Sequence, residues 1–150
     1  MKRSLSLLFI SLILVSCSSG PLELPSPPDL FEVIAERVGI TDMYDLSDEM
    51  LEDVIGIPSE SCESAVYMTP GTGISPEVII IVKANTAEDV DLIEEKLEKR
   101  LAYVRKSAEN YLIEEMPMID KAVLRRDGLT VSLIISPKVS EINAVYDEYK

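Results

Sequence analysis

The sequence contains no histidine and no tryptophan, and only two of its 150 residues are cysteines. Without histidine the chain cannot form a Ser-His-Asp triad, a Cys-His pair or the histidine-containing sites that commonly bind zinc. Basic residues are also scarce: 14 stand against 27 acidic residues, and the net charge of -13 disfavours nucleic acid as a partner. After residue 15, no apolar run approaches the roughly 18 residues that a membrane-spanning helix requires.

The chain opens with the pattern of a secretory signal peptide. Lys2 and Arg3 provide a positive start, and the apolar run at 5–15 is too short to span a bilayer core of about 30 Å. The run ends in LVSC at 14–17, which resembles the bacterial lipobox. That resemblance implies cleavage before Cys17, lipid on its thiol and attachment to the extracytoplasmic face of the cell membrane. The alternative is an ordinary signal peptide with a cysteine near its end.

Three segments follow from this interpretation. Residues 1–16 are the signal peptide, and 17–28 are the lipidated cysteine and a tether with four prolines, which favour extended backbone. Residues 29–150 are long enough for a single domain with a core. Because a lipidated Cys17 cannot pair, we expect no disulfide, and we expect Cys62 to be a small buried thiol rather than a nucleophile.

Apolar residues recur at helical spacing in four segments. These segments are 29–38, 47–55, 87–111 and 138–149. Asp29 and Thr86 are the predicted N-caps of the first and third helices, and Gly39 and Gly56 should end the first and second. The third helix is the longest, and its apolar stripe runs to Tyr111.

Short β-rich runs form two predicted hairpins. Segments 62–68 and 76–83 are joined by a long loop, and 119–126 and 129–136 are joined by Asp-Gly at 127–128. The second run is apolar on both faces, so the long helix should cover one side and the N-terminal helices the other. We predict an α+β fold, a two-layer sandwich whose four-stranded antiparallel sheet packs on the long helix. The element order is α-α-β-β-α-β-β-α, with strand order 2-1-3-4.

Two patterns suggest ligand sites, but each departs from the motif that it resembles. Six acidic residues between positions 42 and 53 invite a calcium site, yet their spacing does not match the loop D-x-[DN]-x-[DN]-G. We expect a solvated acidic face there. The glycine-containing turn at 69–73 lacks the Lys-Ser/Thr pair of a phosphate-binding P-loop. We therefore expect neither a metal nor a cofactor.

Charged residues offer two further candidates. Basic residues at 96–106 on the long helix could bind an acidic glycan or a wall polymer, although an ordinary charged helix face explains them as well. A pair of carboxylates drawn from Glu77, Glu114 and Glu115 could act as acid and base, as in glycosidases. Because acidic residues are so frequent here, closeness in sequence says little. We expect no catalytic residues.

Several short motifs between residues 30 and 149 are similar to those of a known family. They are SAVYM at 64–68, PEV at 76–78, LEKRL at 97–101 and KAV at 121–123, with Tyr111, Pro117 and Gly128. In these motifs the chain resembles DUF4358, a domain-of-unknown-function family of Gram-positive lipoproteins. It departs from the family pattern at Ile113 and Thr130, where proline and tyrosine are usual. The resemblance implies a lipoprotein address and a single domain. Because the family has no assigned activity, it implies no functional residues.

Together these observations predict a lipid-anchored, extracytoplasmic binding or interaction module of the cell membrane that is not an enzyme. Its expected partners are the membrane, through the lipid on Cys17, and an envelope protein or wall polymer. The sequence does not fix the oligomeric state. The alternative is a small-ligand or solute-binding accessory lipoprotein, which needs a concave pocket of roughly 300 Å³ or more.

Overall fold

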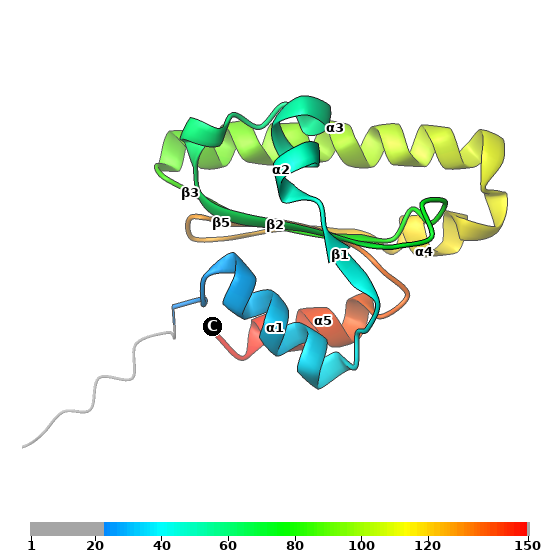
Figure 1. Cartoon of the computed structure of the whole chain (residues 1–150), viewed down its shortest axis with the longest axis horizontal. Coiled ribbons are helices and arrows are strands. Elements are labelled where there is room, and N and C mark those ends of the chain that lie inside the picture. Colours follow the sequence, from blue (N-terminus) through cyan, green and yellow to red (C-terminus); the bar gives the residue numbers. More distant parts are fainter. Residues whose placement is uncertain (1–22, 150) are drawn as a thin grey trace, which may run out of the picture.

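A computed structural model describes residues 23–149, which form one sheet with helices on both faces (Figure 1). Cys17, the predicted signal peptide and the first part of the predicted tether lie outside the described residues. The strands are β1 (Met43–Asp45), β2 (Cys62–Pro70), β3 (Val78–Ala84), β4 (Val123–Asp127) and β5 (Thr130–Ile135). The α-helices are α1 (Pro27–Val38), α2 (Ser47–Met50), α3 (Ala87–Tyr111), α4 (Met116–Asp120) and α5 (Val139–Asp147). Three short segments complete the fold: the π-helical η1 (Leu51–Ile55) and the 3-10 helices η2 (Ser59–Ser61) and η3 (Ile113–Glu115).

The sheet is antiparallel throughout, with the order β1-β2-β3-β5-β4. The predicted order 2-1-3-4 is wrong, because β3 pairs with β5 and the first predicted strand does not touch the third. Burial explains the difference. Every residue of β5 is buried, as is every residue of β3 except Lys83, and such strands belong in the middle of a sheet. The fifth strand, β1, was not predicted, since three residues are too few to display an alternating pattern.

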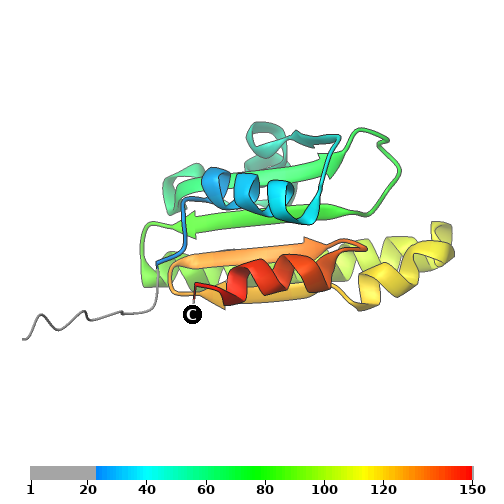
Figure 2. The same cartoon turned by 90° about the horizontal axis from the view of Figure 1, so that it is seen from below.

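Helices cover both faces of the sheet, which gives three layers rather than the predicted two (Figures 1 and 2). Val78, Ile80 and Val82 join the core beneath α3, where α2 and η1 also pack. Ile79 and Ile81 point the other way, into a second core beneath α1 and α5. The prediction that both faces of β3 are covered is confirmed. The second predicted helix, however, lies on the α3 side, and α5 completes the opposite layer.

The ends of α1 and α3 follow their cap residues. Ser26, not Asp29, caps α1: its Oγ accepts from the Asp29 backbone N–H at 3.4 Å and donates to the Asp29 carboxylate at 2.6 Å. The helix therefore begins at Pro27, inside the segment predicted as tether. Gly39 ends α1 with a left-handed φ of 67°, as predicted. Thr86 caps α3, also as predicted.

The region after α3 differs from its prediction. Tyr111, assigned to the buried stripe, is 86 % exposed, because the last turn of α3 extends past the end of the sheet (Figure 1). Residues 119–122 belong to α4 and its turn rather than to a strand, and Pro117 sits in the first turn of α4, where its missing N–H costs nothing. The hairpin turn at Gly128 is confirmed by its φ of 61°. Within residues 23–149, no helix is both long and apolar enough to cross a membrane.

Candidate functional site

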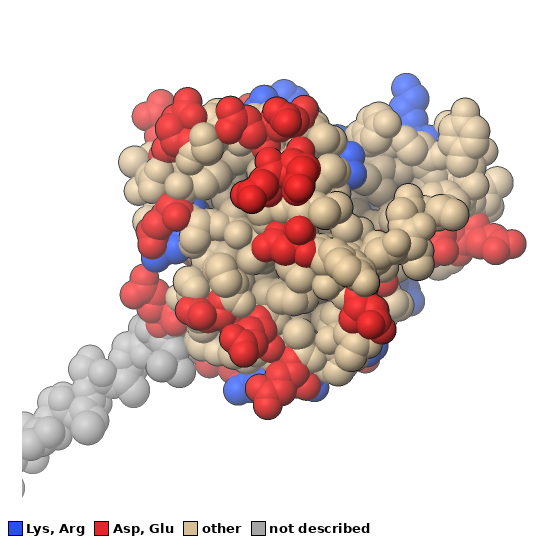
Figure 3. Space-filling model, viewed as in Figure 1, with Lys and Arg blue, Asp and Glu red and all other residues tan. Residues whose placement is uncertain are grey.

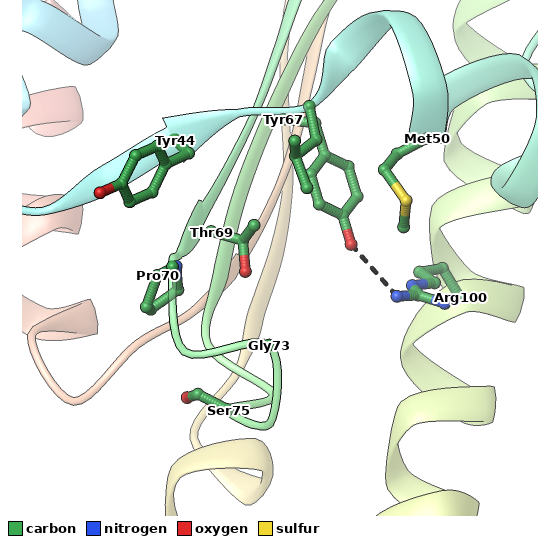
Figure 4. A pocket seen from close by; sticks show the side chains of 10 residues that line it. Tyr44, Met50, Tyr67, Thr69, Pro70, Gly73, Ser75 and Arg100 are labelled. Carbon is green, nitrogen blue, oxygen red and sulfur yellow. Dashed lines mark hydrogen bonds between the residues drawn. The ribbon is translucent and has the colours of Figure 1, made fainter.

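An open cleft of about 530 Å³ lies between the β2–β3 loop, β1, α2 and α3 (Figure 4). Ten residues line it: Tyr44, Leu46, Met50, Tyr67, Thr69, Pro70, Gly71, Gly73, Ser75 and Arg100. We call it the Tyr67–Arg100 cleft, after the two side chains that meet at its inner end. Hydroxyl groups, apolar side chains and one guanidinium group share its walls, so it offers both polar and apolar contacts.

Hydrogen bonds donated by three backbone N–H groups fix the wall formed by β1 and α2. The Tyr67 N–H donates to the Ser47 hydroxyl at 2.8 Å, and the Leu46 N–H donates to the Tyr67 carbonyl at 2.9 Å. Asp45 accepts from the Ser47 N–H at 2.9 Å and thereby orders the corner between β1 and α2. These bonds hold α2 over β2, so that Met50 lies beside the Tyr67 ring (Figure 4).

The β2–β3 loop forms the opposite rim. A Cβ at Gly71 would lie 2.5 Å from Cε2 of Tyr44, so the absence of a side chain lets the Tyr44 ring pack directly against the loop. Thr69 and Ser75 are held at the base of the loop. The Thr69 hydroxyl donates to the Glu77 carbonyl at 3.2 Å, and the Ser75 hydroxyl accepts from the Glu77 N–H at 3.1 Å. The loop is thus ordered by its own hydrogen bonds.

Arg100 reaches the cleft from α3. Its Nη2 donates to the Tyr67 hydroxyl at 3.1 Å, and its guanidinium carbon lies 5.7 Å from the centre of the Tyr103 ring. Its Nε is buried and has no hydrogen-bond partner among the described residues. Leaving a buried donor unpaired costs about 1–3 kcal/mol, so the guanidinium is incompletely satisfied where it stands.

Arg100 also differs from the other arginines of residues 23–149, because it forms no ion pair with a carboxylate there. The four that do are Arg37, Arg105, Arg125 and Arg126. Acidic residues outnumber basic ones by 27 to 14, so an arginine without a carboxylate partner is unexpected in this chain. Its positive charge is directed at a cleft that is open to solvent, where it can attract an anionic group from outside.

A second cleft, of about 480 Å³, lies on the other side of Arg100. Lys96, Lys99 and Tyr103 line it, together with η1. This is part of the predicted basic cluster at 96–106, but its charge is partly neutralised. Lys99 forms an ion pair with Glu95. The cluster is therefore a weaker site for a wall polymer than the sequence suggests.

Three carboxylates were considered for an acid-base pair, and the fold places Glu77 apart from Glu114 and Glu115. Glu77 precedes β3 and accepts a hydrogen bond from the Ser136 hydroxyl at 2.7 Å. Glu114 and Glu115 lie in η3, where they line a different cleft of about 300 Å³ at the end of α3. The acidic residues at 42–53 also remain dispersed: among residues 23–149 no three potential ligands are grouped closely enough to hold a metal ion.

Cys62 lies at the start of β2, half-buried against the core beneath α3. Its thiol donates to the Pro58 carbonyl at a sulfur–oxygen distance of 3.6 Å. Burial raises the pKa of this thiol, and the nearby carboxylates of Asp89 and Glu60 raise it further. The neutral thiol is therefore favoured, which lowers the fraction of thiolate that a nucleophile requires.

The surface around the Tyr67–Arg100 cleft contrasts with the rest of the visible face. Clusters of acidic side chains are spread over the part of that face above α1, α2 and the first half of α3, whereas the region over the β2–β3 loop and the second half of α3 is mostly uncharged (Figure 3). Sequence reasoning missed the cleft. The available signal was that SAVYM contains Tyr67 and LEKRL contains Arg100, two of the motifs on which the family resemblance depends.

Comparison with known proteins gives one match. No curated protein and no solved structure matches the chain. A family model described as a domain of unknown function (DUF4358) matches residues 36–136, a segment that contains all five strands of the sheet, α3 and both side chains at the inner end of the cleft. The matched segment covers most of the chain, and the resemblance seen in the short motifs is confirmed. The chain therefore belongs to the DUF4358 family of domains of unknown function.

Proposed function

We propose that this protein is a non-catalytic binding module, lipid-anchored to the extracytoplasmic face of a bacterial cell membrane, and that the Tyr67–Arg100 cleft is its binding site. Arg100 carries the proposal, because it is an arginine without a carboxylate partner among the described residues and it faces an open cleft in an acid-rich protein. Among the described residues, those that line the cleft include no carboxylate and no thiol, which suits binding better than acid-base or nucleophilic chemistry.

The position of the cleft suits a domain that is tethered by its N-terminus. The described chain begins at one end of the sheet, and the β2–β3 loop lies at the opposite end in both views (Figures 1 and 2). If Cys17 is anchored in the membrane, the β2–β3 loop that borders the cleft lies at the end of the domain opposite to the start of the described chain. The proposed partner is accordingly an envelope protein or another component outside the membrane.

Replacing Cys17 with alanine is expected to abolish lipid labelling of the full chain and to move it out of the membrane fraction or leave it unprocessed. Two acyl chains bind a membrane durably, since each buried methylene contributes about 0.8 kcal/mol. Labelling with radioactive palmitate followed by cell fractionation measures both effects. Cys62→Ala is the matched control and should keep the label. A lipid-labelled Cys17→Ala product would refute the anchor.

Photo-crosslinking in cells tests the cleft. A photoreactive residue at Ile74, which is 74 % exposed on the β2–β3 loop, should give a discrete adduct in bacteria that produce the full chain. The same residue at Leu129, an exposed apolar position in the turn between β4 and β5, should give none. The Ile74 adduct should disappear in an Arg100→Gln background. Identical adducts from both positions, or no adduct from either, would contradict the proposed site.

A solute-binding role is the second candidate, favoured by the volume of the cleft. About 530 Å³ falls within the range of roughly 300–1,000 Å³ that small-molecule sites occupy. The adduct formed at Ile74 separates the two candidates. A macromolecular partner adds kilodaltons to the chain on a denaturing gel, whereas a solute adds only a small increment that mass spectrometry detects.

A further inference from the structure

We propose that the Tyr67–Arg100 cleft recognises a single carboxylate group on a ligand with an apolar body, held jointly by the Arg100 guanidinium and the Tyr67 hydroxyl. The inference rests on the proposed function, since it names the chemistry that the proposed binding site selects. It covers two sources of that chemistry, the C-terminus of a peptide chain and a free organic acid.

The first argument is the surplus of hydrogen-bond donors in the cleft. A guanidinium has five N–H donors, and Arg100 uses one of them in its hydrogen bond to the Tyr67 hydroxyl. That hydroxyl accepts the bond and so keeps its own proton to donate. The Ser75 hydroxyl likewise accepts from the Glu77 N–H and keeps its proton. An ionised carboxylate, which only accepts hydrogen bonds, is the complement of such a set.

The second argument is charge. Within residues 23–149, Arg100 is the only cation that lines the cleft, so the site neutralises one negative charge. A dianionic phosphate would keep an unmatched charge. A polyanion would carry further charges outside the cleft, and the net charge of -13 on the chain would repel them within the screening length of about 8 Å at physiological salt. A monoanion confined to the cleft avoids both costs.

The third argument is the apolar wall that faces Arg100. Met50, Leu46 and Pro70 line the same cleft, and Met50 extends toward the space between Tyr67 and Arg100 (Figure 4). A flexible thioether adapts to side groups of different shape. A carboxylate at Arg100 would therefore place the neighbouring part of its ligand against apolar side chains, which favours an apolar body.

A purely structural role explains Arg100 less well. The hydrogen bond to Tyr67 does connect α3 to β2, but a bond to a neutral hydroxyl does not require a donor with a positive charge. The guanidinium adds a charge without a carboxylate partner and a buried Nε without an acceptor among the described residues, and neither favours folding. The charge becomes favourable once an anion binds in the cleft, because it is then matched and the accessible guanidinium donors gain acceptors.

The test uses the full chain, isotopically labelled and kept in a mild detergent, and follows the Arg100 Nε–H and the Gly73 amide by NMR. N-acetyl-L-phenylalanine should shift both signals saturably in the millimolar range expected for so small a ligand. Its primary amide should bind at least about tenfold more weakly, because it loses the charge-assisted hydrogen bonds. A pentapeptide that ends in phenylalanine with a free C-terminus identifies the source: tighter binding than the small acid indicates a chain terminus, and equal binding a free acid.

Variants connect the shifts to the two side chains. Arg100→Gln, which removes the positive charge but keeps a polar side chain, should weaken carboxylate binding at least about tenfold, and Tyr67→Phe should weaken it less. Arg126→Gln, at an exposed arginine outside the cleft, should change nothing. Thermal unfolding checks each fold, and Tyr67→Phe keeps the test decisive if Arg100→Gln does not fold.

Three results would overturn the proposal that the cleft recognises a carboxylate: equal binding of acid and amide, tighter binding of inorganic phosphate, or no saturable shift with any carboxylate probe. If the Ile74 crosslink persists in cells while the carboxylate fails, the binding module stands and only its ligand chemistry is wrong. If the carboxylate binds but no crosslink forms, the cleft chemistry stands and the proposed envelope partner is wrong.

Discussion

Replacing Ile80 with alanine is expected to lower the free energy of unfolding by about 2–5 kcal/mol, enough to unfold much of a marginally stable domain. Ile80 is fully buried at the middle of β3, where it pairs with Tyr67 of β2 and Leu133 of β5. It also faces the core beneath α3. Truncation there removes apolar contacts and leaves a cavity that a central strand cannot collapse to fill. Urea unfolding measures the loss.

Two variants calibrate this result. Ile80→Val should cost only about 0.5–1.5 kcal/mol, because it removes a single methylene from the same position. Ile74→Ala makes the same change as Ile80→Ala, but on the exposed β2–β3 loop. Its free energy of unfolding should stay within about 0.5 kcal/mol of that of the wild type. If Ile80→Ala were no more destabilising than Ile74→Ala, β3 would not be the central strand that the structure describes.

Local elements of this fold are readable from the sequence because their causes are local. The αL end of α1 needs only Gly39, and the start of α3 needs only Thr86 and the N–H groups that follow it. Strand order has no such local cause. Both hairpins are antiparallel in the predicted order and in the observed one, so antiparallel pairing alone does not choose between them. The strand order is decided by the burial of β3 and β5, which are buried almost throughout and therefore pair at the centre of the sheet.

The candidate site could not be predicted from the sequence for a related reason. Tyr67 and Arg100 are 33 positions apart, and each has an ordinary local explanation, one as a strand aromatic and the other as a charged helix residue. The informative fact about Arg100 is the lack of a carboxylate partner within residues 23–149. With 27 acidic residues in the chain, only three-dimensional positions reveal which arginines are paired.

A polar network on the α5 side of the sheet was equally invisible in sequence, and it supports the second large prediction. The Arg125 side chain is only 12 % exposed and donates to Asp127 at 2.6 and 3.1 Å and to the Asn143 side-chain carbonyl at 2.9 Å. Its guanidinium carbon lies 4.2 Å from the centre of the Tyr146 ring. The Tyr146 hydroxyl bonds to Ser132 at 2.8 Å, and burial raises the pKa of Tyr146, so this ring stays neutral beneath the cation.

Replacing Arg125 with methionine is expected to lower the free energy of unfolding by about 3 kcal/mol, since it leaves the Asp127 carboxylate, itself 19 % exposed, without its buried partner. Its neighbour provides the matched control. Arg126 pairs with Asp91 and Glu94 at 2.7 and 3.4 Å, but it is 41 % exposed, so Arg126→Met should cost about 0–1 kcal/mol. Urea unfolding at low and high salt measures both, and salt should erase the Arg126 contribution first, because exposed pairs are screened more strongly.

In a double-mutant cycle, Asp127→Asn should recover part of the loss caused by Arg125→Met, because the neutral amide is cheaper to bury. Strictly additive losses, or equal losses at the two arginines, would show that burial does not set the strength of this network.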